Sequence, residues 1–462
     1  MVFVSVAAAA SAAAVAAAAS GSSSAAAAST TNSASPFKVS FNVHQTHEAR
    51  HASGLYNVTS ETYYSNPISL KAGHMIFTNP EQTPLTLPSG RIGITSFFGD
   101  IVDANHEPVP LSKVYDHHWI AVADTHINEI CSSSVNYVFG IGAESRHGTV
   151  DIPSGYAYVV DNDMTTWGAN IHLLRTEGLA GDNQIRAAKE CNECYYAPDK
   201  GAQCTPNQNG TFLCCGENDC DGVESCPTAS GDLPAEATYY LRYRIDYTRD
   251  VSAVQPVHVS IATAPDCATF YEVLRNDEQP AHLVHYRFKL PVDINLVFAQ
   301  GHQHAGAINI SMSVNGVRQC TSYPRYGTQK DVAGNELGYL VQMSQCVNSS
   351  TGAMLLKTGD TVSIESYYNV ASHDPRLAYS DGTHLNVMSY MYMIYTRGGS
   401  SGPSGALETS QVPLLRAPGT AVGESLNSMA LDGVPMEQSV VRGTRVWKRV
   451  PQPKQPVERA AA

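Results

Sequence analysis

The sequence predicts an all-β protein with two antiparallel β-sandwich, jelly-roll-like domains in tandem. Three observations support this: hydrophobic residues alternate with polar ones in several segments, turn signals separate those segments, and helical periodicity is confined to Asn183 to Glu190. The clearest alternation places Leu241, Tyr243, Ile245 and Tyr247 on one face and Arg242, Arg244 and Asp246 on the other. Successive side chains of a strand point to opposite faces, so this pattern is typical of half-buried antiparallel strands.

The same period of two recurs along the chain, from the first ordered segment to the last. It runs through Phe37–Val43, Ile308–Val314 and Val362–Tyr368. Turn signals such as Pro88-Ser89-Gly90 and Ser380-Asp381-Gly382 separate the runs. These segments predict strands in both halves of the chain.

Composition excludes two classes of protein. The 462 residues carry 42 acidic and 29 basic side chains, a net charge of −13, which argues against a broad nucleic-acid-binding surface. Charged residues are only 15%, but hydrophobic residues reach 43%, so the chain as a whole is not predicted to be disordered. We therefore expect a folded protein without a nucleic-acid partner.

Domain boundaries follow from shifts in composition. Residues 1–36, rich in Ala and Ser, predict a signal peptide or an uncleaved anchor with a linker, although the usual positive n-region is missing. We predict a first sandwich at 37–252, a second at 253–397 and a disordered low-complexity tail at 398–462. The expected location is secreted, extracellular or at the cell surface, with a membrane partner only if the Ala-rich segment stays as an anchor.

The cysteines fit an oxidising compartment. Seven of the 11 lie in a loop-like insertion at 191–226, where the Cys191-x-x-Cys194 pair is compatible with zinc but disulfides are favoured. Cys320 and Cys346 bracket one strand pair, which predicts a disulfide between them. Because 11 is odd, at least one thiol is free, intermolecular or in a removed segment. Four glycosylation sequons, at Asn57, Asn209, Asn309 and Asn348, suit the same compartment.

Three histidine motifs stand out among the 17 histidines. They are Asp116-His117-His118-Trp119, Asn170-Ile171-His172 and Gly301-His302-Gln303-His304. The i, i+2 spacing of His302 and His304 puts both rings on one face of a strand, where they can share a metal. Adjacent His117 and His118 converge only at a bulge or a strand end. Imidazole suits copper, zinc, iron and nickel, so the ligand type does not choose the metal, and structural histidines remain an alternative for each motif taken alone.

These motifs resemble the plant stress up-regulated nodulin family. The resemblance also includes Glu193-Cys194, Cys214-Cys215 and the stretch from His302 through Gly334-Asn335-Glu336-Leu337-Gly338-Tyr339 to Cys346, and it covers roughly 37–396. That family in turn is similar to the ascorbate-dependent type II copper monooxygenases, which include the peptidylglycine α-hydroxylating and dopamine β-hydroxylating enzymes. The resemblance implies two β-sandwich domains with one copper on each, two coppers per chain, and ascorbate as reductant.

The resemblance also implies the ligands. His117, His118 and His172 match the copper that stores and passes an electron. His302, His304 and Met388 match the copper that binds oxygen, with Met388 opening the run Met388-Ser389-Tyr390-Met391-Tyr392-Met393-Ile394-Tyr395. A thioether is a soft ligand that favours Cu(I), the state that meets oxygen. Packing of Met388 in the core is the alternative.

Two departures leave the substrate open. The resemblance places a carboxylate-binding Arg where this chain has Gln300, and a neutral amide cannot form the bidentate charged pair that Arg gives. It also places an Asn where this chain has Tyr390. The Tyr that comes next in the family's motif is kept here as Tyr392, which we predict to contact the substrate. A glycine-extended peptide is therefore a poor expectation, and a small or apolar substrate with oxygen is favoured.

Other motifs carry no function. The run Gly398-Gly399-Ser400-Ser401-Gly402 matches a nucleophile elbow formally, but it lies in the low-complexity tail with no helix after it. The cluster of His44, His47 and His51 is compatible with loose metal binding, but exposed loop histidines are favoured. Two functions remain: a secreted copper monooxygenase that hydroxylates a C–H bond, or a non-catalytic secreted copper-binding, stress or cell-surface module that keeps the fold.

Overall fold

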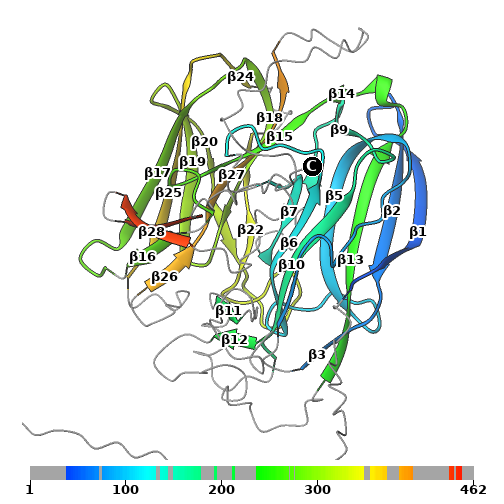
Figure 1. Ribbon diagram of the computed structural model, residues 1–462, viewed down its shortest axis with the longest axis horizontal. Helices are drawn as coiled ribbons and strands as arrows, with labels where there is room; N and C mark the ends of the chain where they lie inside the picture. Colours follow the sequence, from blue (N-terminus) through cyan, green and yellow to red (C-terminus); the bar gives the residue numbers. More distant parts are fainter. Residues whose placement is uncertain are drawn as a thin grey trace, which may run out of the picture. The chain divides into compact units, whose positions relative to one another are not determined.

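A computed structural model gives the fold of the chain. It describes residues 38–71, 75–131, 136–143, 149–177, 192–194, 211–213, 236–269, 271–274, 276–347, 354–371, 384–398, 436–441 and 444–449. All of them belong to one compact unit, Lys38–Ala462. The described elements are strands, with one short 3₁₀ turn at Val251–Ala253 (η4), so the predicted all-β class is confirmed (Figure 1).

The first sandwich consists of two sheets. The larger has the order β1-β2-β13-β5-β9-β14, with β3 beside β13 and β8 beside β5. Its strands are β1 (Phe41–Arg50), β2 (Asn57–Ser65), β3 (Ile68–Lys71), β5 (Arg91–Asp103), β8 (Val150–Asp151), β9 (Tyr156–Asp161), β13 (Glu236–Thr248) and β14 (Gln255–Pro256). The smaller has the order β4-β10-β6-β7 and consists of β4 (Met75–Thr78), β6 (Val114–Ala123), β7 (Phe139–Ile141) and β10 (Trp167–Arg175).

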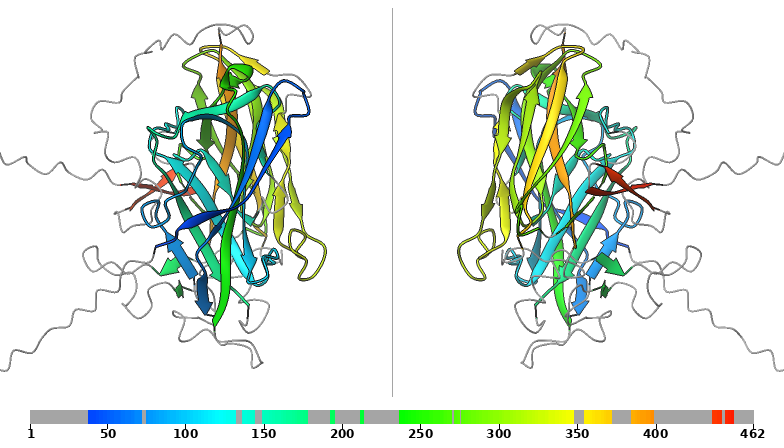
Figure 2. Two further views of the ribbon diagram at one scale, coloured as in Figure 1. Left: turned by 90° about the vertical axis from the view of Figure 1, so that its right-hand side faces the viewer. Right: turned by 90° about the vertical axis from the view of Figure 1, so that its left-hand side faces the viewer.

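The second sandwich also has two sheets. One has the order β15-β27-β18-β23, with β24 beside β18, and consists of β15 (His258–Thr263), β18 (Ile294–Gln303), β23 (Gln345–Val347), β24 (Met354–Leu356) and β27 (Ser389–Arg397). The other has the order β17-β25-β19-β20 and consists of β17 (Ala281–Lys289), β19 (Ala307–Val314), β20 (Val317–Ser322) and β25 (Thr361–Asn369). Figure 2 shows these strands running side by side.

Smaller sheets complete the described strands. They are the pair β11 (Asn192–Cys194) and β12 (Thr211–Leu213), the pair β21 (Pro324–Tyr326) and β22 (Leu340–Met343), and a four-stranded sheet of β26 (His384–Val387), β16 (Tyr271–Leu274), β29 (Thr444–Arg449) and β28 (Met436–Val441). The last of these places β28 and β29 inside the segment that the sequence predicted to be disordered. Strand β29 pairs with β16 and with β28, and both strands contain Val residues of high β-propensity.

The two sandwiches share an apolar interface. Strand β27 is buried along almost its whole length, and its alternate residues enter two different cores. Met391 and Met393 pack inside the second sandwich, whereas Tyr390, Tyr392 and Ile394 join a cluster that continues into the first. Because one face of this sheet covers the first sandwich, the histidine motifs of β6, β10 and β18 face a common interface.

The predicted alternation holds in the long strands. In β13, Leu241, Tyr243, Ile245 and Tyr247 are buried and the intervening residues are only partly buried. Ile308 departs from its predicted face and is 38% exposed, because a register shift lies between Ala307 and Asn309. A one-residue slip moves a side chain to the opposite face, and only the strand pairing reveals it.

Two disulfides join described cysteines. Cys320 and Cys346 are bonded, with Cα atoms 5.1 Å apart, and Cys131 is bonded to Cys267 across the two sandwiches. The predictions for residues 1–36, for a helix at Asn183 to Glu190 and for most cysteines of 191–226 lie outside the described residues. Within the described part of the chain, no helix is long and apolar enough to cross a membrane.

Candidate metal centre

A β-bulge in β6 brings two adjacent imidazoles together. Strand β10 pairs with β6 so that His172 lies opposite His118 and Leu173 lies opposite Asp116, which leaves His117 as the extra residue. The bulge removes the usual alternation at that point, and the Nδ1 atoms of His117 and His118 lie 3.3 Å apart. The structure therefore contains the distortion that adjacent ligands require.

The third imidazole of this set comes from the neighbouring strand. Each of His117, His118 and His172 offers one ring nitrogen, and these three nitrogens lie within 4.8 Å of one another. Two nitrogens that bind one metal at about 2.1 Å are at most about 4.2 Å apart. The upper bound of 4.8 Å on their separations is thus close to what one shared ion allows.

Asn170 determines which nitrogen of His118 is available. The Nε2 of His118 lies 2.5 Å from the Oδ1 of Asn170, while the Nδ2 of Asn170 donates to the carbonyl of Thr78 at 2.6 Å. Because the amide donates to Thr78, its oxygen faces the imidazole and accepts the Nε2 proton. This leaves the lone pair of His118 on Nδ1, the atom that faces His117.

The electrostatics of His117 favour a neutral ring. Burial lowers the pKa of His117 well below its usual value, and the neighbouring imidazoles of His172, His304, His118 and His302 lower it further. A neutral imidazole is the form that binds metals. The four neighbours include both histidines of the third motif, so the two predicted sets lie close together.

The second set lies on one face of the β18–β27 pair. His302 is paired with Tyr390 and Gln303 with Ser389, which places His304 opposite Met388 at the next position. Side chains directly opposite each other in an antiparallel pair share a face, so His302, His304 and Met388 face the same side. The two imidazoles are perpendicular, with ring centroids 5.6 Å apart.

A tyrosine hydroxyl holds the end of this pair. The backbone N–H of His304 donates to the hydroxyl of Tyr368 at 2.8 Å, and that hydroxyl donates to the carbonyl of Met388 at 2.5 Å. Tyr368 lies in β25 and is fully buried. One side chain of the outer sheet thus fixes the backbone at two of the predicted ligands.

The two sets form one contiguous cluster of histidines. The ring of His117 lies 4.6 Å from that of His172 and 5.4 Å from that of His304, measured between centroids. His117 belongs to the first sandwich and His304 to the second.

Three other positions considered in the sequence lie on β18 and β27, the strands next to the second set. The ring of Tyr390 stacks on His302 with centroids 5.1 Å apart. The hydroxyl of Tyr392 donates to the carbonyl of Val138, so its predicted contact with substrate stays a prediction. Gln300 donates from Nε2 to the carbonyl of Met343 at 3.0 Å.

The histidines near the N-terminus lie elsewhere: His44 packs against Tyr64 on the larger sheet of the first sandwich.

A comparison with models of known families finds one match that runs through most of this fold. The model of stress up-regulated Nod 19 matches residues 56–129 and 122–395, which include all six predicted ligands.

This chain belongs to the stress up-regulated Nod 19 family.

The expected resemblance to the nodulin family is thereby confirmed. The match covers both sandwiches of this Nod 19 family member, from β2 to β27. A comparison with curated proteins finds no match.

Solved structures offer only distant likenesses to this Nod 19 family member. A structure of PNGF-II in a C2 crystal form has 8% identity and a TM-score of 0.27, covering 75% of this chain and 60% of that one. The structure of recombinant peptide:N-glycanase F (PNGase F) has 10% identity and a TM-score of 0.27. That match covers 71% of this chain and 95% of the other. A structure of the Gt strain of infectious bursal disease virus has 9% identity and a TM-score of 0.17. That match covers 78% of this chain and 74% of the other. Such low scores support no inference about the activity of this chain.

Sequence reasoning missed several residues of the site. The motif that contains Asn170 does not by itself indicate that its amide orients His118. Its i, i+2 spacing from His172 does place both side chains on one face of β10. Tyr368 and the Cys131–Cys267 disulfide gave no local signal, because their partners lie on distant segments.

Proposed function

We propose that this Nod 19 family member is a secreted copper protein with a monooxygenase-like centre that binds two coppers and hydroxylates a substrate C–H bond. One observation carries the proposal: His117, His118 and His172 present three ring nitrogens within 4.8 Å, in contact with the second histidine set. Copper bound there would take electrons one at a time from ascorbate and supply them to oxygen. Zinc, iron and nickel also bind imidazole, and the thioether of Met388 favours copper among them.

The residues of the chain have distinct roles in this proposal. The bulge at His117 lets three imidazoles converge, and Asn170 holds His118 with its Nδ1 lone pair directed at the site. On the other sandwich, Tyr368 fixes the backbone of His304 and Met388. The ring of Tyr390 covers one face of His302 and keeps water from it.

The proposed secretion is supported by the disulfides. Cys131–Cys267 and Cys320–Cys346 are bonds that persist in oxidising compartments and are rare in reducing ones. Copper and oxygen chemistry with ascorbate would therefore take place outside the cytosol. The substrate of that chemistry is a small or apolar molecule that remains to be identified by assay.

The deciding experiment measures copper content and ascorbate-dependent oxygen uptake together. The metal-free protein is titrated with copper, and we expect two coppers per chain. The variant His302→Ala with His304→Ala should retain one copper, because the first set lies on different strands. The control variant His44→Ala with His47→Ala removes two imidazoles from β1 and should still bind two.

Three outcomes would revise the proposal. A protein that binds no copper would refute it. A protein that binds two coppers but consumes no oxygen with ascorbate and candidate substrates would be a non-catalytic copper-binding module. Equal copper loss in the double variant and in the His44/His47 control would show that binding does not involve the β18 histidines.

A further inference from the structure

A cavity lies beside the second histidine set. Its volume is about 470 Å³, within the range of pockets for small molecules, and it is lined by Thr149, Gln300, Tyr323, Pro324, Arg325, Gln342, Met343, Ser344 and Gln345. Gln300 lies two residues before His302 on β18, so the two side chains share a face about 7 Å apart along the strand. A ligand in this cavity would approach the histidine cluster from one side.

Among the described residues that line the cavity, Arg325 is the one charged side chain. Arg325 lies opposite Gln342 in the β21–β22 pair, and its Nε donates to the Oε1 of Gln342 at 2.8 Å. That bond orients the guanidinium and uses one of its five N–H groups. Among the described residues, neither terminal nitrogen of Arg325 has a partner in an ion pair or a hydrogen bond.

Charge around Arg325 is not neutralised by the lining. None of the described residues that line the cavity is acidic. The lining residue Thr149 donates its hydroxyl to the carboxylate of Asp151, which also accepts the hydroxyl of Ser96. The cavity therefore offers one positive charge to a ligand, although the protein as a whole carries a net charge of −13.

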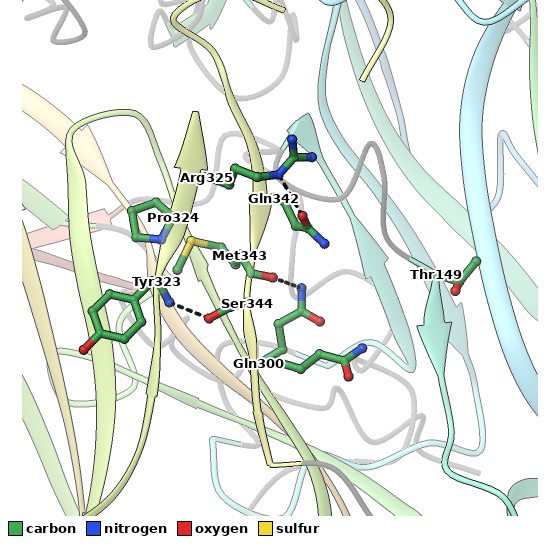
Figure 3. Close-up of a pocket in the computed structure, with 9 residues that line it drawn as sticks. Thr149, Gln300, Tyr323, Pro324, Arg325, Gln342, Met343 and Ser344 are labelled. Carbon is green, nitrogen blue, oxygen red and sulfur yellow. Dashed lines mark hydrogen bonds between the residues drawn. The ribbon is translucent and has the colours of Figure 1, made fainter. Parts of the chain in front are cut away.

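The other polar side chains of the described lining are amides and hydroxyls. Figure 3 shows the side chains of Arg325, Gln342 and Gln300 near one another, with Thr149 on a separate segment, whereas the ring of Tyr323 points away. Gln300, Gln342 and Gln345 each carry a donor and an acceptor. Hydroxyl groups are also both donors and acceptors, so a hydroxylated ligand matches this lining.

We propose that this cavity binds a small hydroxylated monocarboxylate, of the sugar-acid type, with its carboxylate on Arg325. A planar carboxylate matches the fork of a guanidinium and forms two parallel hydrogen bonds with it. The described lining supplies one cation, which matches the single charge of a monocarboxylate. Binding itself does not depend on copper; only the delivery of the ligand to His302 rests on the proposed function.

Binding is tested on the metal-free, full-length protein with D-galacturonate and its methyl ester. These two probes have the same ring and hydroxyls and differ in charge. We expect calorimetry to show the acid binding at least tenfold more tightly than the ester. The variant Arg325→Met should remove this difference by weakening the acid and leaving the ester unchanged.

A matched control comes from another exposed arginine. Arg318 lies on β20 and pairs with Glu365 at 3.3 Å, outside the cavity lining. Arg318→Met removes the same charge, and its binding of the acid should equal that of the unchanged protein. Circular dichroism verifies that both variants keep their strands.

Several results would overturn the inference. These are no binding of the acid at 10 mM (roughly the weakest affinity worth assigning to a site), equal affinity for acid and ester, or equal loss in Arg325→Met and Arg318→Met. Copper stoichiometry is measured separately on the same preparations. A chain that binds copper but not the acid refutes only the cavity, and a chain that binds the acid but not copper refutes only the copper proposal.

Discussion

The two histidine sets achieve convergence in different ways. On β6 and β10, adjacent His117 and His118 need a bulge, and the amide of Asn170 orients one of the rings. On β18, His302 and His304 converge by the regular period of the strand, and a tyrosine from another sheet fixes the backbone. The first set is thus oriented through its side chains and the second through its main chain. This difference predicts that the two sets respond differently to substitution.

The largest expected effect is the loss of one metal from the first set. His172 is the member contributed by β10, and it lies opposite His118. In His172→Ala the remaining pair cannot hold the ion firmly, so copper content should fall from two to one per chain. Copper titration followed by electron paramagnetic resonance would show which signal disappears. Retention of two coppers would refute the assignment of His172.

The two disulfides should contribute unequally to stability. Cys131 and Cys267 are 136 residues apart and Cys320 and Cys346 are 26 apart. Loop-closure entropy then gives upper values of about 5 kcal/mol for the first and about 3.5 kcal/mol for the second. Guanidinium unfolding of the two Cys→Ser double variants, both metal-free, should show the larger loss for Cys131→Ser with Cys267→Ser. The reverse order would contradict this account.

Substitution of Asn170 should weaken the first copper without affecting the second. Partners that orient a ligand through its second ring nitrogen typically account for about 10-fold to 100-fold in metal affinity. Asn170→Ala removes the acceptor for His118, and a competition assay with a chelator should show a loss in this range. Asn170→Asp keeps an acceptor oxygen and should restore most of the affinity. Equal affinities in the two variants would show that the amide does not position His118.

The smallest effect is expected at Tyr368. Tyr368→Phe leaves the N–H of His304 and the carbonyl of Met388 without the hydroxyl, which should cost about 1–3 kcal/mol of unfolding free energy. Copper affinity of the second set should fall by less than tenfold, since the β18–β27 ladder still holds both strands. Thermal unfolding and copper competition measure the two effects. A loss of copper as large as in Asn170→Ala would erase the difference between the sets.

Much of the fold was predictable because a strand with one buried face alternates hydrophobic and polar residues along the sequence. The alternation in β13 predicted both the strand and its buried face. Prediction failed where strand pairing is irregular, as at Ile308, which a register shift places on the exposed face. Bulges and sheet partners depend on the neighbouring strand, which the local sequence does not specify.

The sequence by itself determined that the chain is all-β, which histidines can share a face of a strand, and that adjacent His117 and His118 converge only at a bulge or a strand end. These properties follow from the geometry of a single strand. Only the tertiary structure decided that His117 contacts His304, that Asn170 orients His118 and that Arg325 stands beside Gln300 in one cavity. Periodicity determines the face on which a side chain lies, but the packing of sheets determines what covers that face.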